Sequence, residues 1–364
     1  MCKGEYTSIA NGRSPLDENG NGNGNGDSND NETAGGRLQY TSIANGRSPL
    51  DENGNGNGDS NDNETAGGRL QFQGMQQEQE QERSQLQLQS QWQSPETFRK
   101  AVRDKKFHGP TNGVCPGYIQ CNLVVLKEKD AFDFLLFCQR NKQACPLIEV
   151  LDVGSHSPSQ SCGNNASESG SASLSPDDTC MVDLRTDIPK YRIYEHGKLV
   201  EETSDVTNHW PEDSVAFLIG CSFTTDGALI KAGIRLRAVE QQQNVPMYKT
   251  NIPCASAGSL SGTMVVSMKP IKAVDIAKEV LITSKFPHAH GAPVCVGCPA
   301  SIGIKNIMEP DYGDVIEVKE DELPVFHACG VTPQNIILES QVPFAITHAP
   351  GHMLVTDLLA DKPV

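Results

Sequence analysis

Apolar residues are sparse in the first part of the chain and recur in regular patterns from Ser94 onward. The sequence Ser-Pro-Glu at 94–96 offers a helix N-cap, a proline at the first helical position and an acidic residue in the first turn. Phe98, Ala101 and Val102 follow at helical spacing. We therefore expect the folded part to begin with a helix at Ser94.

Strand-like and helix-like patterns alternate through the rest of the chain. A strand is expected over 119–126, and the helix that opens at Asp130 is apolar nearly all round, which predicts that it is buried. The remaining expected elements are a strand reading LIEVLDV, a hairpin over 191–203 that turns at His196 and Gly197, a strand over 215–220 leading into a helix that ends near Gly233, a strand reading TMVVSMK, a helix over 273–284, a short strand near 294–296, and a strand reading PVFHACG followed by a helix capped by Thr332.

This alternation predicts an α/β fold with a mixed-sheet layered core, and the hairpin-rich middle predicts a smaller α+β subdomain beside it. Residues 154–181 are rich in serine and almost free of large apolar residues, which predicts a surface insertion. The folded domain is expected to span residues 94–361. In the helix over 273–284 the apolar residues are expected to face inward, namely Val274, Ile276, Ala277, Val280 and Leu281.

The N-terminal stretch contains an internal duplication. Residues 6–39 recur almost unchanged as residues 40–71, and a Gln-rich tract continues to Gln93. Each copy is dominated by Asn, Gly, Asp and Ser, so a stack of such repeats has too little apolar surface to bury a core. We predict that residues 1–93 are a disordered low-complexity region whose Gln-rich part is a linker.

The chain is acidic, with a formal net charge of −16, and its first 93 residues hold 14 acidic and 6 basic residues. No cluster of Lys and Arg suits a phosphate backbone, so we expect no nucleic-acid partner. No apolar run is long enough to span a bilayer, so we expect no membrane partner. The N-terminus lacks an apolar signal core, which favours a cytoplasmic protein; a mitochondrial location is the alternative, although there is no clear transit peptide. A homo-oligomer is compatible with the sequence.

The cysteines and histidines give little indication of a metal or cofactor. Twelve cysteines in a chain without a secretion signal are expected to be reduced. Cys295 and Cys298 form a single CxxC, and His288 and His290 share a strand face, but neither pair has further ligands that would complete a zinc site. There is no GxxxxGK[ST], and no GxGxxG follows a strand. We expect neither a metal nor a cofactor.

Four polar segments lie between the apolar ones and are predicted to form one pocket. The segment at 244–254 reads NVPMYKTNIPC, and its two prolines predict a rigid, irregular loop. The other three are GCSF at 220–223, CGVTP at 329–333 and THAPGH at 347–352.

Two of these segments fall where a strand passes into a helix. Cys221 and Ser222 occupy one junction, and Cys329 and Thr332 occupy the other. Free backbone N–H groups at such junctions favour an anion, and a substrate carboxylate would suit. A plain helix-capping role is the alternative for Ser222.

Three further side chains are candidates for a site. His290 or His348 can act as acid or base, because imidazole titrates near neutrality, and a structural role is the alternative for each. Arg185 either grips a substrate carboxylate or forms a structural ion pair with Asp187.

Taken together, the motifs resemble those of the D-glutamate cyclase family of hydro-lyases, over essentially all of the chain from Ser94 to Leu358. The resemblance rests on FHGPTNGVCPGYIQCNLVVL, FDFLLFCQRN, CPLIEV, DLRTDIPKYRIY, VAFLIGCSF, NVPMYKTNIPC, VVSMKPI, ITSKFPHAHGAPV, VFHACGVTPQ and ITHAPGHMLVTDL. It implies an α/β fold with a smaller second domain. It also implies a lyase that removes water, as in the conversion of D-glutamate to 5-oxo-D-proline.

On this basis we expect a small amino-acid substrate and cyclisation of D-glutamate through attack of its amine on its own γ-carboxyl. The site residues predicted for the reaction are Arg185 for the α-carboxylate, His290 or His348 as base, Ser222, Asn251 and Thr332 as hydrogen-bond donors, and Tyr248, Cys221 and Cys329 around the substrate. The alternatives are a hydro-lyase acting on another small amino or hydroxy acid, and a non-catalytic module that binds an acidic metabolite.

Overall fold

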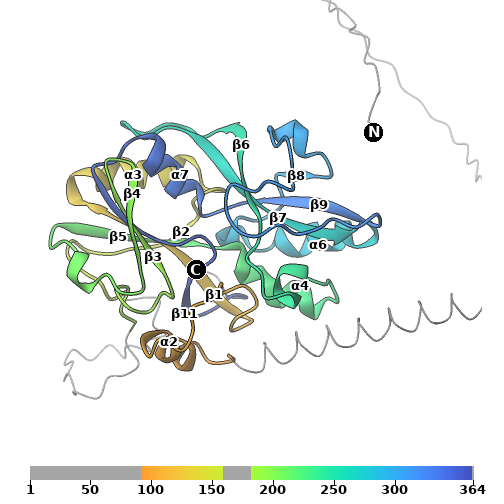
Figure 1. The fold of residues 1–364 in the computed structure, drawn as a ribbon, viewed down its shortest axis with the longest axis horizontal. Helices are drawn as coiled ribbons and strands as arrows, with labels where there is room; N and C mark the ends of the chain where they lie inside the picture. The colour runs from red at the N-terminus through yellow and green to blue at the C-terminus, as the bar shows by residue number, and fades with distance from the viewer. Residues whose placement is uncertain (1–91, 159–181, 363–364) are drawn as a thin grey trace, which may run out of the picture. The chain divides into compact units, whose positions relative to one another are not determined.

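The computed structural model describes residues 92–158 and 182–362. The region predicted to be disordered therefore lies outside the described residues up to residue 91, as do residues 159–181 of the predicted insertion. The described part is α/β, as predicted, and contains two β-sheets with helices packed against them (Figure 1).

The larger sheet has seven strands, and every strand pair in it is antiparallel. Its order is β2-β5-β1-β10-β3-β4, with β11 also pairing with β1. The long central strand β1 is rich in β-branched and leucine residues and is buried along nearly its whole length. The strands are β1 (Tyr118–Lys127), β2 (Leu147–Val150), β3 (Tyr191–Glu195), β4 (Lys198–Thr203), β5 (Ser214–Gly220), β10 (Phe344–His348) and β11 (Leu354–Leu359).

The smaller sheet has four strands in the order β6-β7-β9-β8, again all antiparallel. They are β6 (Met247–Pro253), β7 (Thr263–Lys272), β8 (Cys295–Val296) and β9 (Glu322–Ala328). The segment expected to be an irregular loop at 244–254 thus contains a strand, and that expectation was wrong. The two prolines are tolerated because β6 is an edge strand and Pro253 stands at its end.

Helices connect and cover the sheets. The first, α2, has Ser94 at its N-cap and buries Phe98, Ala101 and Val102, as predicted. The α-helices are α2 (Pro95–Arg103), α3 (Glu128–Arg140), α4 (Asp226–Lys231), α5 (Arg237–Glu240), α6 (Ile276–Thr283) and α7 (Thr332–Glu339), and the 3-10 helices are η1 (Thr207–His209), η2 (Ser222–Thr225), η3 (Ala273–Asp275), η4 (Pro287–Ala289) and η5 (Pro299–Ile302).

In two helices the buried side chains differ from those that the apolar pattern of the sequence predicts. In α3, Phe134 and Phe137 are buried, but Phe132 is 71% exposed, so the prediction of burial nearly all round was wrong. Val274 of η3 and Leu281 of α6 are exposed, and Glu279 of α6 is fully buried, which reverses part of the predicted inward face. The reason lies in the partner that Glu279 meets, described below.

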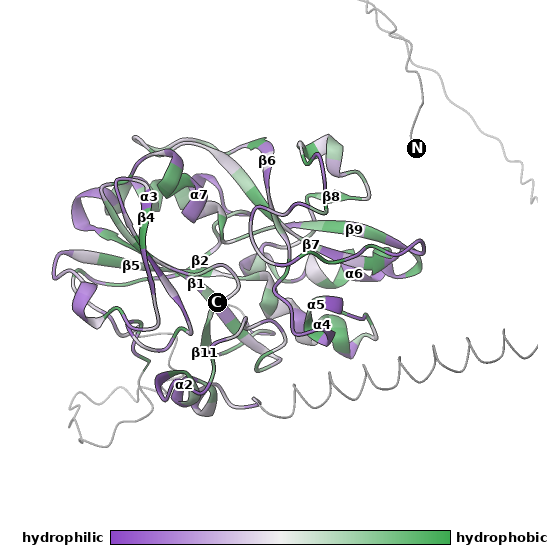
Figure 2. Cartoon of the chain, in the orientation of Figure 1, coloured by the Kyte–Doolittle hydropathy of each residue, from purple (hydrophilic) through white to green (hydrophobic). Residues whose placement is uncertain are grey.

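Apolar side chains cover both faces of the larger sheet. One cluster includes Leu123, Val125 and Leu218, and another on the opposite face includes Val124 and Phe217. In the smaller sheet, β9 is mainly hydrophobic, as its green colour in Figure 2 shows. No helix in the described ranges has the length and hydropathy needed to cross a membrane.

Candidate active site

The four segments predicted to share a pocket do come together. Three of them, at 220–223, 244–254 and 329–333, contribute to one buried cluster, and Met353, directly after the fourth, belongs to it as well; the side chains that meet there are mainly apolar. Asn244 joins two of the segments, because its amide donates to the Pro350 carbonyl at 2.9 Å and Gly351 packs directly against it. The cluster contains Cys221 and Phe223, Val245 and Met247, Cys329 and Val331, and Met353.

The two strand-to-helix junctions pack against each other through Asn122 of β1. Its amide donates to the Gly220 carbonyl at 2.7 Å, at the end of β5. On the other side it lies against Gly330, where an added Cβ would come within 2.0 Å of the amide nitrogen. Glycine at 330 is therefore what allows the turn after β9 to approach β1.

The segment around η4 lies against the first of these junctions. A Cβ at Gly220 would fall 1.6 Å from the His288 carbonyl oxygen, so the two backbones are in direct contact. This approach brings His290 into the interior, where its Nδ1 donates to the Gln143 carbonyl at 2.8 Å. Burial lowers the pKa of His290 to about 4, although the carbonyls of Gln143 and Gly220 act in the opposite direction.

A buried ion pair lies beside the end of β5. Lys269 on β7 contacts Asp226 at 2.7 Å, and the two side chains are only 6% and 3% exposed. Asp226 begins α4 and also accepts a hydrogen bond from the Gly113 backbone. Burial raises the pKa of Asp226, and Lys269 opposes that rise. A charge pair removed from water in this way is costly, which makes it a candidate for function.

A second buried pair joins the smaller sheet to α6. His327 Nε2 on β9 lies 2.7 Å from Glu279 Oε1, and the two side chains are 3% and 0% exposed. This contact explains why α6 turns Glu279 inward and leaves Val274 and Leu281 in solvent. The strand register places Ser267 of β7 directly opposite His327.

Several buried polar atoms around these pairs have no hydrogen-bond partner among the described residues. They are Asn122 Oδ1, Ser267 Oγ, Glu279 Oε2 and His290 Nε2. An unsatisfied buried polar atom costs on the order of 1–3 kcal/mol, so several near one another are unusual in a region that only supports the fold. We refer to Asp226, Ser267, Lys269, Glu279, His290 and His327 as the buried polar cluster.

A surface groove lies close to this cluster. It has a volume of about 440 Å³, and a much smaller cavity of about 10 Å³ shares Arg237 and Pro270 with it and is lined by Asp226 and Lys269. The groove therefore adjoins the Lys269–Asp226 pair. Its charged lining consists of Arg235, Arg237, Lys272 and Lys319 with Glu240, Asp275, Glu317, Asp321 and Glu322.

Comparison with known proteins identifies the family. The sequence profile described as D-glutamate cyclase matches residues 215–357. A protein of Bacillus velezensis named "putative hydro-lyase" is 50% identical over 265 residues, which cover 73% of this chain and 94% of that protein. The chain belongs to the D-glutamate cyclase family. It is thus a member of a hydro-lyase family, as the sequence motifs predicted.

Other relatives agree with this assignment. The "putative hydro-lyase YcsI" of Bacillus subtilis is 48% identical over 73% of this chain and 96% of its own length. A solved structure, a nitrogen repressor-like protein of Methanococcus jannaschii, aligns over 69% of this chain and 90% of that one, with a TM-score of 0.30 and 11% identity. A similarity that low does not indicate a shared fold.

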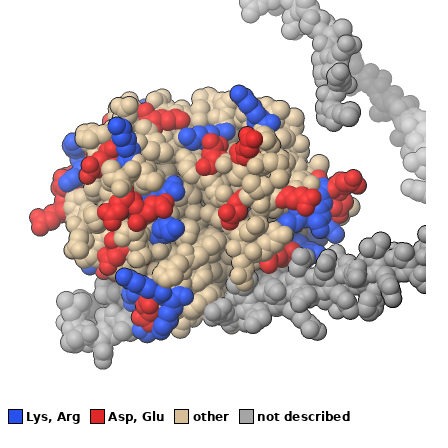
Figure 3. Space-filling model, viewed as in Figure 1, with Lys and Arg blue, Asp and Glu red and all other residues tan. Residues whose placement is uncertain are grey.

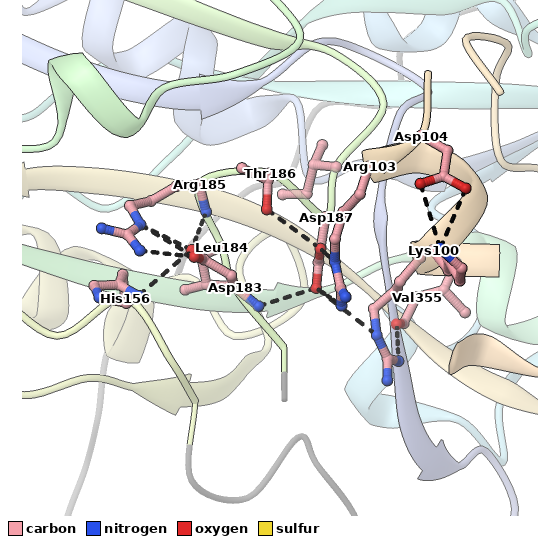
Figure 4. A network of polar contacts seen from close by, with 12 residues as sticks. Lys100, Arg103, Asp104, His156, Asp183, Leu184, Arg185, Thr186, Asp187 and Val355 are labelled. Carbon is pink, nitrogen blue, oxygen red and sulfur yellow. Dashed lines mark hydrogen bonds and ion pairs between the residues drawn. The ribbon is translucent and has the colours of Figure 1, made fainter. Parts of the chain in front are cut away.

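Within this family member, Arg185 is already paired. Its guanidinium donates twice to Asp183, at 2.9 and 2.7 Å, and its side chain is 25% exposed (Figure 4). The structural ion pair that the sequence suggested therefore forms with Asp183, and Asp187 instead meets Arg103 of α2. The guanidinium of Arg185 is therefore bound by a carboxylate of the chain itself.

His348 and Thr332 have all their polar groups engaged by the fold. His348 Nδ1 lies 3.2 Å from the Leu123 carbonyl and Nε2 lies 3.2 Å from Gln334, and burial lowers the pKa of the ring to about 3. The Thr332 hydroxyl donates to the Cys329 carbonyl at 2.7 Å and accepts from Val265 N–H. These contacts fit structural roles.

The other predicted site residues differ in how exposed they are to solvent. Burial raises the pKa of the Cys329 thiol and of the Tyr248 hydroxyl to about 12 each, and Tyr248 donates to the Ile307 carbonyl at 2.5 Å. Burial also raises the pKa of Cys221 well above its usual value. Ser222 is 4% exposed and begins the 3-10 helix η2. Asn251 is exposed on the edge strand β6.

Sequence reasoning missed Asp226, Lys269, Glu279 and His327. Lys269 and His327 stand inside apolar strand patterns, where a charged or titratable residue in a buried run is itself a signal. Glu279 was missed because the apolar pattern of its helix predicts that other residues face the interior. No group of three His, Cys, Asp or Glu side chains in the described ranges is arranged to hold a metal ion.

Proposed function

We propose that this protein cyclises D-glutamate to 5-oxo-D-proline with release of water, and that the buried polar cluster is where the reaction takes place. Membership of the D-glutamate cyclase family supports the reaction class. The proposed location of the reaction is supported by two buried ionic contacts beside the converging motifs, Lys269–Asp226 and His327–Glu279.

The chemistry needs a cation and a base, and this region can supply both. The substrate carboxylates need a cation, and Lys269, which is paired with Asp226, is a buried cation in this region. The ammonium must lose its protons to a base, for which a histidine is suited. Ring closure itself gains from intramolecularity, because the amine and the γ-carboxyl are held in one small molecule.

The test is incubation of the purified full-length chain with D-glutamate, L-glutamate and 5-oxo-D-proline separately, followed by chiral chromatography. We expect conversion confined to the D series. Turnover of a different small amino or hydroxy acid would assign another hydro-lyase substrate. Stoichiometric binding of D-glutamate without turnover would instead favour an acidic-metabolite-binding module.

Lys269→Met provides a second test of the location. It removes the cation and leaves Asp226 buried without its partner, so we expect a loss of stability of about 3–5 kcal/mol together with loss of activity. The double variant Lys269→Met/Asp226→Leu removes both charges and should recover much of the stability but none of the turnover. Full activity in the folded double variant would place the reaction elsewhere.

A further inference from the structure

Three histidines are buried among the described residues, and they differ in what their ring nitrogens meet. His348 has both nitrogens in hydrogen bonds to the surrounding chain. His290 donates to a backbone carbonyl and is held by burial in its neutral form. His327 alone of the three pairs with a carboxylate, Glu279.

The contact with Glu279 determines which nitrogen of His327 can accept a proton. Glu279 Oε1 lies 2.7 Å from Nε2 and, as a carboxylate, accepts the Nε2 hydrogen. In the neutral ring this leaves the lone pair on Nδ1. A carboxylate that fixes the tautomer and supports the imidazolium is the arrangement by which enzymes prepare a histidine for proton transfer.

From this geometry we propose that His327 carries the protons of the cyclisation and that Glu279 positions it. The inference rests on the proposed function and names the base for it. The other groups close to His327 are Ser267 opposite it on β7, His290 after η4, and Asp226 from the start of α4, which is itself paired with Lys269. Lys269 and Asp226 offset each other in charge, so Glu279 is the unbalanced charge beside the ring.

The proton steps balance. Nδ1 of His327 takes a proton from the α-ammonium, and the freed amine lone pair forms the C–N bond to the γ-carboxyl carbon. The imidazolium returns that proton to a carboxyl oxygen, and the second proton of the nitrogen follows the same route. The C–O bond then breaks, and the oxygen leaves as water with both protons.

The experiment compares His327→Gln and Glu279→Gln with the wild type, and His209→Gln is the matched control. His209 also lies near a glutamate, Glu201 at 3.7 Å, but this pair is at the surface, with side chains 39% and 47% exposed. For each full-length variant, kcat and KM for D-glutamate, the pH profile of kcat/KM and the melting temperature are measured.

For His327→Gln we expect kcat to fall about 100-fold or more, with KM changed less than about threefold. Glu279→Gln should keep part of the activity and move the acid limb of kcat/KM to lower pH, because loss of the carboxylate disfavours the imidazolium. His209→Gln should match the wild type.

The experiment distinguishes failure of the proposed function from failure of the role given to His327. A folded wild type without turnover of D-glutamate overturns the proposed function and this inference with it. An active wild type whose His327→Gln variant keeps more than about a third of kcat overturns the role of His327 alone. If His327→Gln does not fold, the profile of Glu279→Gln decides, and an acid limb that does not move counts against the inference.

Discussion

At the scale of single residues, burial sets the chemistry of the histidines. His290 and His348 sit in the interior with pKa values of about 4 and about 3, so both are neutral at physiological pH. Because the charged form is disfavoured in the folded state only, these residues link stability to pH. They stabilise the fold fully above the ordinary value of 6.5, and the contribution is lost as pH falls through 6.5 toward the folded-state values.

We therefore expect the protein to lose stability on mild acidification. At pH 5 the loss should be about 2 kcal/mol for each of the two histidines relative to pH 7. Urea unfolding at the two pH values measures it, and His348→Gln should remove about half of the difference. His209→Gln, which changes an exposed ring, should not alter the pH dependence. A pH-independent midpoint would contradict the assignment of these rings as neutral and buried.

Arg185 offers a second prediction at this scale. Because Asp183 already occupies its guanidinium, Arg185→Ala should change KM for D-glutamate less than about threefold. The pair is partly exposed, so the free energy of unfolding should fall by less than about 1 kcal/mol. Asp183→Asn is the companion variant. A KM raised more than about tenfold by Arg185→Ala alone would restore it as the group that binds the substrate carboxylate.

At the scale of elements, the sequence predicts those features that are local. The N-cap and proline of α2, the apolar run of β1 and the His196–Gly197 turn between β3 and β4 each depend on neighbouring residues, and the structure confirms them. The orientation of α6 depends on His327, 48 residues away from Glu279, and no helical pattern contains that information. The edge position of β6 likewise depends on how distant strands pair.

The same limit applies to the site. The polar segments and their convergence could be predicted, because prolines, glycines and small polar residues mark them locally. The buried polar cluster could not, because Asp226 and Lys269 are 43 residues apart, and the polar residues inside the strand patterns of β7 and β9 do not reveal which partners they meet. Which polar residues are paired in the interior is a property of the tertiary structure.

Gly330→Ala tests the packing between the two sheets. Its Cβ would come within 2.0 Å of the Asn122 amide nitrogen, so we expect a loss of about 1–3 kcal/mol and a fall in activity as the junctions separate. Gly109→Ala is the control, because its Cβ would meet only Phe107 at an ordinary 3.7 Å. Unfolding in urea measures both. Equal stabilities of the two variants would mean that the turn after β9 is free to shift.

At the scale of the whole molecule, the described fold begins slightly before the helix that the sequence marks as its start. Trp92 packs edge-on against Phe98 and Phe107, with ring centroids 5.7 and 6.1 Å apart, and its carbonyl accepts from Cys115 N–H. Charged side chains are spread over the surface, and on the face in Figure 3 basic and acidic groups are interspersed. The described residues thus form a unit whose N-terminal edge is anchored by an aromatic contact.

Two truncated chains test where that edge lies. A chain starting at Gln91 keeps Trp92 and should melt close to the full-length protein, since the composition of the preceding residues predicts no packed core. A chain starting at Ser94 loses Trp92 and should be less stable by on the order of 1–3 kcal/mol. Equal melting temperatures for the two would show that the tryptophan contributes little. A large loss in the longer one would contradict the prediction of disorder before it.

The central position of β1 has a consequence for how the protein is made. The ribosome adds this strand long before two of its partners, β10 and β11. Arg99 likewise donates a hydrogen bond to Asp357, which lies 258 residues further along the chain. Contacts so distant in sequence slow folding and leave apolar strands unpaired during translation. We therefore expect β1 to lack these two partners in the nascent chain until β10 and β11 have been synthesised.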